Sequence, residues 1–324
     1  MRSLLRTGLM VLVACGLVYL VATKWRDLGL DRISLPGKPA SSEQDPPPDG
    51  ETIRIASFNI QALGHSKLEK QHVMETLVNL VRRFDIVAIQ EIRSKQQDVL
   101  PRFVELINAN DGGKDGGRQY DFVISGRLGR TSSQEQYAFV FDTQRIEIDR
   151  RYAYTVADPG DRLHREPFVA AFRARGPPPD QAFTFTLINI HTDPDEVDQE
   201  LNALDDVYRA VQYDGRGEDD VFLLGDLNTH SGRLGELGRI PYLTCAIAEK
   251  KTNTRQDKQY DNILFHGEAT SEFTGRSGVV NFKDEGGLTL QQALEVSDHL
   301  PIWAEFSVYE GGKPGYVAGQ AARR

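Results

Sequence analysis

The chain has 324 residues, of which 40% are hydrophobic and 26% are charged, a composition that is ordinary for a soluble protein and ample for a buried core. The formal net charge of −9 argues against a nucleic-acid coat protein, because binding to many phosphates requires a basic surface. It does not exclude an enzyme that holds phosphates through metal ions and a local arginine cluster. The two cysteines, Cys15 and Cys245, cannot form a disulfide framework.

The first 25 residues differ from the rest of the chain. Two arginines precede an apolar run over residues 8–22. As a helix this run would span about 22 Å, somewhat less than the roughly 30 Å of a bilayer core. We expect residues 1–25 to be a signal peptide or an uncleaved signal anchor. The stretch around Cys15 is similar to a bacterial lipidation site, but the apolar run continues past the cysteine, which favours an anchor.

Residues 26–51 include the stretch PGKPASSEQDPPPDG, whose composition predicts an extended, flexible linker. Together the two segments predict an exported protein, either secreted or membrane-anchored, in the periplasmic or extracellular space. The linker would hold the body away from the membrane. Structure is expected to restart at Thr52, with one large domain over residues 52–309 and a tail over residues 310–324.

The body contains many predicted strands and a few long helices. Alternating or short apolar runs predict strands over residues 52–61, 85–91, 120–126, 136–142, 168–174, 182–191, 220–228, 259–265 and 299–308. Apolar residues at helical spacing predict helices over residues 66–83, 101–110 and 194–213. Residues 110–118 predict a flexible loop, and the acidic stretch 193–220 is expected on a solvated helix. The pattern indicates two packed sheets with helices outside them.

Six segments share one feature, an apolar run that finishes in a polar residue. They carry Asn59, Glu91, His191, Asp226 with Asn228, Asp261, and Asp298 with His299. The last pair lies in LEVSDHLPIWAEF, an alternating run over residues 294–306 that predicts a half-buried strand. One such residue alone is more often a helix cap, a turn residue or a satisfied surface group. Six together predict a shared cleft, because strand ends in one sheet can converge.

The residue types in this set point to one chemistry. Carboxylates with an amide oxygen are hard ligands that suit Mg²⁺, Mn²⁺ or Ca²⁺, and there is no Cys/His cluster for zinc. Two histidines, each able to pair with a carboxylate, supply a proton acceptor and a proton donor. The combination predicts hydrolysis of a phosphate ester, in which a metal neutralises charge, a base activates water and an acid assists the leaving oxygen.

The motifs SFNIQ, QEIR, QEQYAFVFD, HREPFVAAF, NIHTDP, GDLNTH, YDNILF and VSDHLPIW, in this order, resemble the endonuclease/exonuclease/phosphatase superfamily. Within it, HTDPDEVDQELNALDDVY and ALEVSDHLPI are similar to the matching stretches of deoxyribonuclease I and its secreted relatives. The resemblance covers about residues 52–308. It implies an α/β fold, a four-layer sandwich of two packed mixed β-sheets flanked by helices.

The resemblance also implies roles for individual residues. Three match metal-site residues: Asn59, Glu91 and Asp298. Four match two acid–histidine pairs: Glu135 with His191, and Asp261 with His299. Asp226 matches a further catalytic group, and either Asp226 or a histidine–carboxylate pair would orient the attacking water. Three match residues that face the substrate phosphate or the DNA groove: Arg165, Asn228 and Arg93.

The implied activity is that of a divalent-metal-dependent phosphodiesterase, a deoxyribonuclease of low sequence specificity that acts outside the cytoplasm. DNA is the implied substrate and Mg²⁺ the implied cofactor, with Mn²⁺ as a substitute and Ca²⁺ in a structural role that is not assigned to residues. No protein partner is inferred, and a monomer is expected. Basic residues are expected to cluster near the site, with these candidates: Arg93, Arg127, Arg130 and Arg165.

Two departures from the subfamily bear on substrate binding and stability. Ser133 stands where the subfamily usually has a tyrosine against the DNA minor groove, and the usual disulfide after GDLNTH is absent, with Ser231 in its place. Two other functions remain open: a sphingomyelinase or phosphoinositide phosphatase with the same catalytic centre, or an inactive binding protein. No aromatic hairpin for lipid insertion is evident, and every expected acid and histidine is present.

Overall fold

The computed structural model describes residues 51–109, 117–131 and 134–312. The predicted signal segment, the linker up to residue 50, most of the 110–118 loop, Ser133 and the tail from residue 313 lie outside the described residues. Within the described ranges, no helix has both the length and the apolar character needed to cross a bilayer.

Two six-stranded sheets form the centre of the body. The first sheet has the order β11-β12-β1-β2-β4-β3, with these bounds: β1 Thr52–Leu63, β2 Ile86–Ile92, β3 Tyr120–Ile124, β4 Gln136–Asp142, β11 Phe273–Val279 and β12 Ile302–Ser307. The second has the order β5-β6-β7-β8-β10-β9, with these bounds: β5 Ile146–Thr155, β6 Phe168–Ala174, β7 Thr184–His191, β8 Val221–Asp226, β9 Leu243–Cys245 and β10 Asp261–His266. Each sheet is mixed, because β1–β2 and β7–β8 are parallel and the other pairs are antiparallel.

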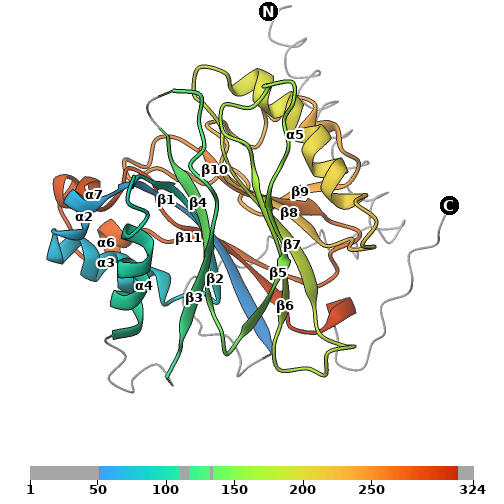
Figure 1. The fold of residues 1–324 in the computed structure, drawn as a ribbon, viewed down its shortest axis with the longest axis horizontal. Coiled ribbons are helices and arrows are strands. Elements are labelled where there is room, and N and C mark those ends of the chain that lie inside the picture. Colours follow the sequence, from blue (N-terminus) through green and yellow to red (C-terminus); the bar gives the residue numbers. More distant parts are fainter. Residues whose placement is uncertain (1–50, 110–116, 132–133, 313–324) are drawn as a thin grey trace, which may run out of the picture. The chain divides into compact units, whose positions relative to one another are not determined.

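Helices cover the outer face of each sheet, which gives four layers (Figure 1). Five lie on the first sheet: α2 His65–Leu68, α3 Gln71–Val81, α4 Val99–Ala109, α6 Phe282–Glu285 and α7 Leu290–Val296. The long helix α5, Val197–Gln212, lies on the second sheet. Short 3₁₀ turns occur at Leu237–Arg239 and Glu310–Gly312. The predicted four-layer sandwich is confirmed.

The two-residue pleat of the strands sorts their side chains between the layers. In β1, Phe58 and Ile60 face the helices, whereas Ile53 and Ile55 face the other sheet. The space between the sheets is filled largely by phenylalanine, and Phe222 packs edge-on against Phe306 at a centroid distance of 4.9 Å. Interlocking rings of this kind bury large apolar areas, so the sandwich does not depend on a disulfide.

The nine predicted strands are all present, but the sequence pattern missed β5, β9 and β11. One face of β5 is exposed and highly charged, and β11 contains Gly275 and Gly278 with a register shift between Phe273 and Ser277, so neither carries a clean apolar alternation. The helix predicted over residues 66–83 is divided into α2 and α3. The helix predicted over residues 101–110 begins two residues earlier, as α4 at Val99.

Two expectations about the polar strand ends were wrong in detail. The stretch 294–306 is not one strand, because α7 ends at Val296 and β12 begins only at Ile302, so Asp298 and His299 lie in the connecting loop. Asp261 is the first residue of β10 rather than a residue near a strand's end. Since β10 is antiparallel to β8, its first residue lies opposite the last residue of β8, Asp226.

Gly225 provides a test of how the strands are held at this end. Its φ is +148°, and an added Cβ would lie 1.9 Å from the carbonyl oxygen of Ile190 on the neighbouring strand. We predict that Gly225→Ala lowers the free energy of unfolding by about 3 kcal/mol, as measured by urea denaturation, because the backbone must move. Gly126→Ala is the matched control, since its Cβ meets nothing within 4 Å. Equal effects of the two substitutions would contradict the prediction.

Candidate active site

The carboxylate of Asp226 lies at the centre of the predicted site and is 1% exposed. Its Oδ2 accepts a hydrogen bond from Asn59 Nδ2 at 3.1 Å and lies 3.5 Å from His191 Nε2 and 3.4 Å from His299 Nε2. Its Oδ1 accepts a hydrogen bond from the backbone N–H of Asn228 at 2.9 Å. Four segments that are far apart in the sequence therefore meet at one carboxylate.

Each histidine is held by a second carboxylate on its other ring nitrogen. His191 Nδ1 lies 2.8 Å from Glu135 Oε1, and His299 Nδ1 lies 2.9 Å from Asp261 Oδ2. All four side chains are buried. The two acid–histidine pairs implied by the family resemblance are thus formed, and each presents its Nε2 to Asp226 from a different side.

Charge pairing offsets burial at this centre. Burial alone would lower the pKa of His299, but the carboxylates of Asp261 and Asp226 raise it to about 10. Burial likewise opposes the charge of His191, yet Glu135 raises the pKa of that imidazole. Burial would raise the pKa of Asp226, but the two imidazoles lower it. The arrangement favours a carboxylate between two imidazolium rings.

Glu91 reaches the same centre through an irregular backbone. Strand alternation would place it with Val87 and Ile89 on the helix-covered face, but its φ is +63° and the β1–β2 register shifts between Asn59 and Leu63. As a result its Oε1 accepts a hydrogen bond from Asn59 Nδ2 at 3.1 Å, and its Oε2 accepts one from the N–H of Ala62 at 3.0 Å. Strain of this kind concentrates at functional sites.

Asp298 completes the predicted metal set. Its neighbour Ser297 donates a hydrogen bond from Oγ to the carbonyl of Asn59 at 2.7 Å, which ties the 297–299 loop to β1. Asp298 Oδ1 is buried and has no hydrogen-bond partner among the described residues. Glu91 and Asp298 both lie close enough to Lys67 to act on its charge, and the amide oxygen of Asn59 accepts the N–H of Gln61 at 2.9 Å. Carboxylate and amide oxygens are hard donors, and one of them here has no partner, so the donor types of Asn59, Glu91 and Asp298 fit a hard divalent ion.

A second set of possible ligands overlaps this one. Ligand atoms of Asp226, Asp261 and His299 all lie within 4.8 Å of one another. Two of these groups already form an acid–histidine pair, and Asp226 is contacted by both histidines. The ligand atoms of this set are therefore already engaged with one another, and the set differs from the predicted metal residues Asn59, Glu91 and Asp298.

Two of the four predicted basic residues, Arg93 and Arg165, lie together at the site, and both face Glu135. Arg93 lies at the site, with Nη2 2.9 Å from Glu91 Oε2. Arg165 is buried, and its Nε lies 3.4 Å from Glu135 Oε1 while it also donates to the carbonyl of His191 at 3.1 Å. Arg130 instead pairs with Asp161 and Glu196.

Two further site predictions have mixed outcomes. The Nδ2 of Asn228 donates to the carbonyl of Thr192 at 2.8 Å, which holds the loop after β8 against the end of β7. The acidic stretch 193–220 is mostly solvated on and around α5, but Glu200 and Asp220 are buried, so the expectation was wrong for these two acids. The carboxylate of Glu200 accepts hydrogen bonds from the N–H groups of His164 and Asp193.

Sequence patterns missed three residues that support the site. Gln90 and Asn189 join the two sheets beneath it, with Gln90 Nε2 donating to Asn189 Oδ1 at 2.7 Å. The signal was present, since Asn189 precedes His191 by one strand period. Lys67 is also buried, and its ammonium donates to the carbonyls of Ile60 at 2.7 Å and Val296 at 2.8 Å, and to that of Gln61. No motif singled out Lys67.

Lys67 lies close to the two acids of the predicted metal set. Burial lowers the pKa of its ammonium to about 8, and the nearby carboxylates of Glu91 and Asp298 oppose that shift. Its three carbonyl partners come from the end of β1 and the end of α7. Lys67 therefore joins the segments that carry Asn59 and Asp298.

Comparison with known proteins gives a consistent result. The model of the Endonuclease/Exonuclease/phosphatase family matches residues 56–299. Deoxyribonuclease gamma of Rattus norvegicus is 30% identical over 265 residues, which cover 78% of this chain and 83% of that protein. Deoxyribonuclease-1-like 1 of Cricetulus griseus is 34% identical over 267 residues, which cover 79% of this chain and 84% of that protein.

Solved structures with much lower identity share the fold. A humanized D. rerio TDP2 superposes with a TM-score of 0.55 at 16% identity, over 79% of this chain and 98% of that one. A mannosyl-6-phosphatase of Bacteroides thetaiotaomicron superposes with a TM-score of 0.52 at 15% identity, over 78% of this chain and 98% of that one. At these identities the likeness concerns the fold alone.

The contacts of Lys67 lead to a prediction about the metal site. We predict that Lys67→Met weakens Mn²⁺ binding at Glu91 and Asp298 by at least about 10-fold, as measured by calorimetry, because the two segments are no longer joined. Lys70→Met is the control, since Lys70 is an exposed neighbour whose one ion pair within the described residues is with Glu295. Unchanged Mn²⁺ affinity in the folded Lys67 variant would remove this residue from the site.

Proposed function

This chain belongs to the endonuclease/exonuclease/phosphatase family, and on that premise we propose that it is a divalent-metal-dependent endonuclease that cuts DNA with low sequence specificity. One observation carries the proposal: two acid–histidine pairs converge on Asp226, next to Glu91, in a chain that is 30–34% identical to deoxyribonucleases over most of its length. The identity to curated nucleases favours DNA over a lipid headgroup or a sugar phosphate.

The metal we propose is Mg²⁺, with Mn²⁺ as a substitute. Glu91, Asn59 and Asp298 would hold it through carboxylate and amide oxygens. When bound, such an ion draws negative charge from the scissile phosphate and makes the phosphorus easier to attack. Arg93, next to Glu91, would add a positive charge on the same side of the substrate.

The protein's own groups then handle the protons. The ring Nδ1 of each histidine is held by Glu135 or Asp261, so each Nε2 is directed to the reacting centre. We propose that one side of this arrangement, with Asp226, orients the attacking water and accepts its proton, while the other imidazolium donates a proton to the leaving 3′ oxygen. Raised histidine pKa values favour the protonated form that the donor needs.

Low sequence specificity follows from the kind of contact that the site offers. Arg93 and Asn228 are polar groups beside Asp226 and Glu91, suited to backbone phosphates, which carry no base information. Arg165 already has Glu135 and two backbone carbonyls as partners. We propose that it orients Glu135 in addition to its predicted role in attracting the substrate phosphate.

We also propose that the enzyme acts outside the cytoplasm, exported and tethered or released through residues 1–25. The apolar run over residues 8–22 and the Pro-rich stretch after it support this proposal. Cell fractionation of the full chain tests it: activity confined to the cytosol would contradict export.

The histidines provide the sharpest test of the mechanism. We predict that His191→Ala and His299→Ala each reduce plasmid nicking with Mg²⁺ by at least about 100-fold, because each removes a proton-transfer group. His72→Ala is the control, since His72 is exposed and its side chain pairs, in the part of the chain that the structure describes, with Glu295 alone. Near-normal nicking by either site variant would exclude that histidine from the mechanism.

The substrate is tested by comparison on one preparation. Supercoiled plasmid, RNA and sphingomyelin vesicles are incubated with the full chain and Mg²⁺, with and without a chelator. We predict nicking of the plasmid that the chelator abolishes. Release of phosphocholine from an enzyme that leaves the plasmid intact would replace the proposed substrate with a lipid.

A further inference from the structure

We propose that a cluster of acidic side chains, at the end of β8 opposite Asp226, is a second divalent-cation site that takes Ca²⁺. The cluster comprises Glu218, Asp219, Asp220, Glu272 and Glu310. Asp220 precedes the first residue of β8 and Asp226 is its last, so the strand separates the two sites by about 20 Å. This site is independent of the catalytic centre and does not rest on the proposed function.

The five acids form two overlapping groups that share Asp220. One oxygen from each of Glu218, Asp219 and Asp220 lies within 4.8 Å of the other two, and the same holds for Asp220, Glu272 and Glu310. The acids come from three places in the chain: the start of β8, the residue before β11, and the turn after β12. Only the folded chain brings them together.

Buried oxygen atoms in this cluster lack partners. Within the described residues, no hydrogen bond is made by Asp220 Oδ1 or Glu272 Oε2, although these side chains belong to residues that are 1% and 2% exposed. The neighbouring hydroxyl of Thr270, also 2% exposed, interacts with the Asp220 carboxyl and has no other partner among the described residues. Buried polar atoms normally have partners, so these oxygens indicate a missing ligand.

The backbone already occupies the other side of the cluster. Glu272 Oε1 accepts the N–H of Gly311, and Glu310 Oε2 accepts the N–H of Thr184 at 3.1 Å. The N–H of Asp220 donates to Glu218 Oε1 at 3.0 Å. Three carboxylates are thus fixed in place by one oxygen each, which prepares the site for a ligand.

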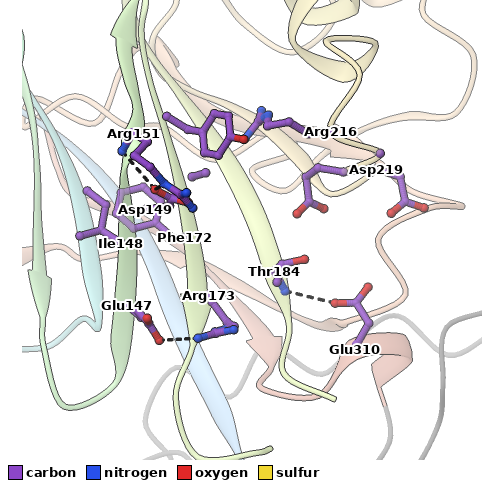
Figure 2. A pocket seen from close by; sticks show the side chains of 14 residues that line it. Glu147, Ile148, Asp149, Arg151, Phe172, Arg173, Thr184, Arg216, Asp219 and Glu310 are labelled. Atoms are coloured by element: carbon purple, nitrogen blue, oxygen red, sulfur yellow. Dashed lines mark hydrogen bonds and ion pairs between the residues drawn. The ribbon is translucent and has the colours of Figure 1, made fainter. Parts of the chain in front are cut away.

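The nearby arginines form their ion pairs with acids outside the cluster, although Arg216 also attracts Glu218. Glu218, Asp219 and Glu310 line a pocket of about 850 Å³ that also contains three arginines, and Figure 2 shows Asp219 and Glu310 on one side of it. Each arginine pairs with a different acid: Arg151 with Asp149, Arg173 with Glu147, and Arg216 with Asp214. Most of the negative charge of the five carboxylates is therefore not paired with an arginine, and a cation from solution can balance it.

The ligand chemistry favours Ca²⁺ over Mg²⁺ or zinc. All the available atoms are hard oxygens, from carboxylates and a hydroxyl, and no cysteine or histidine belongs to the cluster. Ca²⁺ accepts six to eight oxygens in flexible geometry, whereas Mg²⁺ demands a near-ideal octahedron. Because β8 belongs to one sheet and β11 and β12 to the other, a bound ion would fasten the two sheets together.

The experiment measures thermal unfolding of the full chain with Ca²⁺ in a Glu91→Gln background, which removes binding at the catalytic centre. We expect Ca²⁺ at about 100 times its dissociation constant to raise Tm by about 5 °C. Adding Asp220→Asn and Glu272→Gln should abolish the rise. Calorimetry on the same proteins should show one Ca²⁺ site lost. If the double substitution prevents folding, the milder variant Glu310→Gln is used instead. We expect it to weaken Ca²⁺ binding by at least about 10-fold.

The matched control carries Glu69→Gln and Glu105→Gln, which change the net charge equally at two exposed positions. It should keep the full Ca²⁺ response. The proposal is overturned if Ca²⁺ leaves Tm unchanged in the Glu91→Gln protein, or if the cluster variants respond to Ca²⁺ as the control does. Nuclease activity of these proteins does not bear on the Ca²⁺ site: its presence would not support the proposal, and its absence would not contradict it.

Discussion

The site depends on one constraint: the buried carboxylate of Asp226 must be compensated from several directions at once. Its Oδ2 is contacted by Asn59 and faced by the imidazoles of His191 and His299. Removing a charge from water is costly unless it is paired and hydrogen-bonded. The two sheets meet this requirement jointly, because Asn59 belongs to one sheet and His191 to the other. The carboxylate therefore ties the packing of the sandwich to the geometry of its reactive groups.

The inward-facing side chains between the two sheets change from apolar to polar along the strands. At one end it is filled by phenylalanine, and towards the other end the same inward-facing positions become Gln90 and Asn189 and then His191 and Asp226. The register of the second sheet places His191, Asp226 and Asp261 side by side on three adjacent strands. A close-packed apolar core is rigid, so it can hold the polar groups at its edge in fixed positions.

The two ends of β8 illustrate how one fold accommodates concentrated negative charge in different ways. At one end, the charge of Asp226 is balanced by two imidazoles and an amide. The charges of Glu91 and Asp298 at the same end are balanced by the ammonium of Lys67. At Asp220 the neighbours are other carboxylates, and the inferred balance is a bound cation. An ion at that end would restrain segments that are distant in the sequence, because its ligands come from both sheets.

The sequence alone determined the residue types and the general plan. Period-two alternation predicted most strands, and runs ending in Asn59, Glu91, His191 and Asp226 predicted a polar edge, because these features are local. Tertiary structure decided what local patterns do not encode. The antiparallel direction of β10 brings its first residue, Asp261, to the site, and the positive φ of Glu91 turns its carboxylate towards Asn59.

The supporting contacts also required the folded chain. No motif singled out Lys67, yet its ammonium joins β1 to α7. Its partner in α7, Val296, lies 229 positions after Lys67 in the sequence. Likewise, no sequence pattern singled out Glu272 and Glu310, which lie beside Asp220 only because the ends of the two sheets meet there. Burial and pairing depend on which segments meet in space, and propensity and periodicity report only the conformation of each segment by itself.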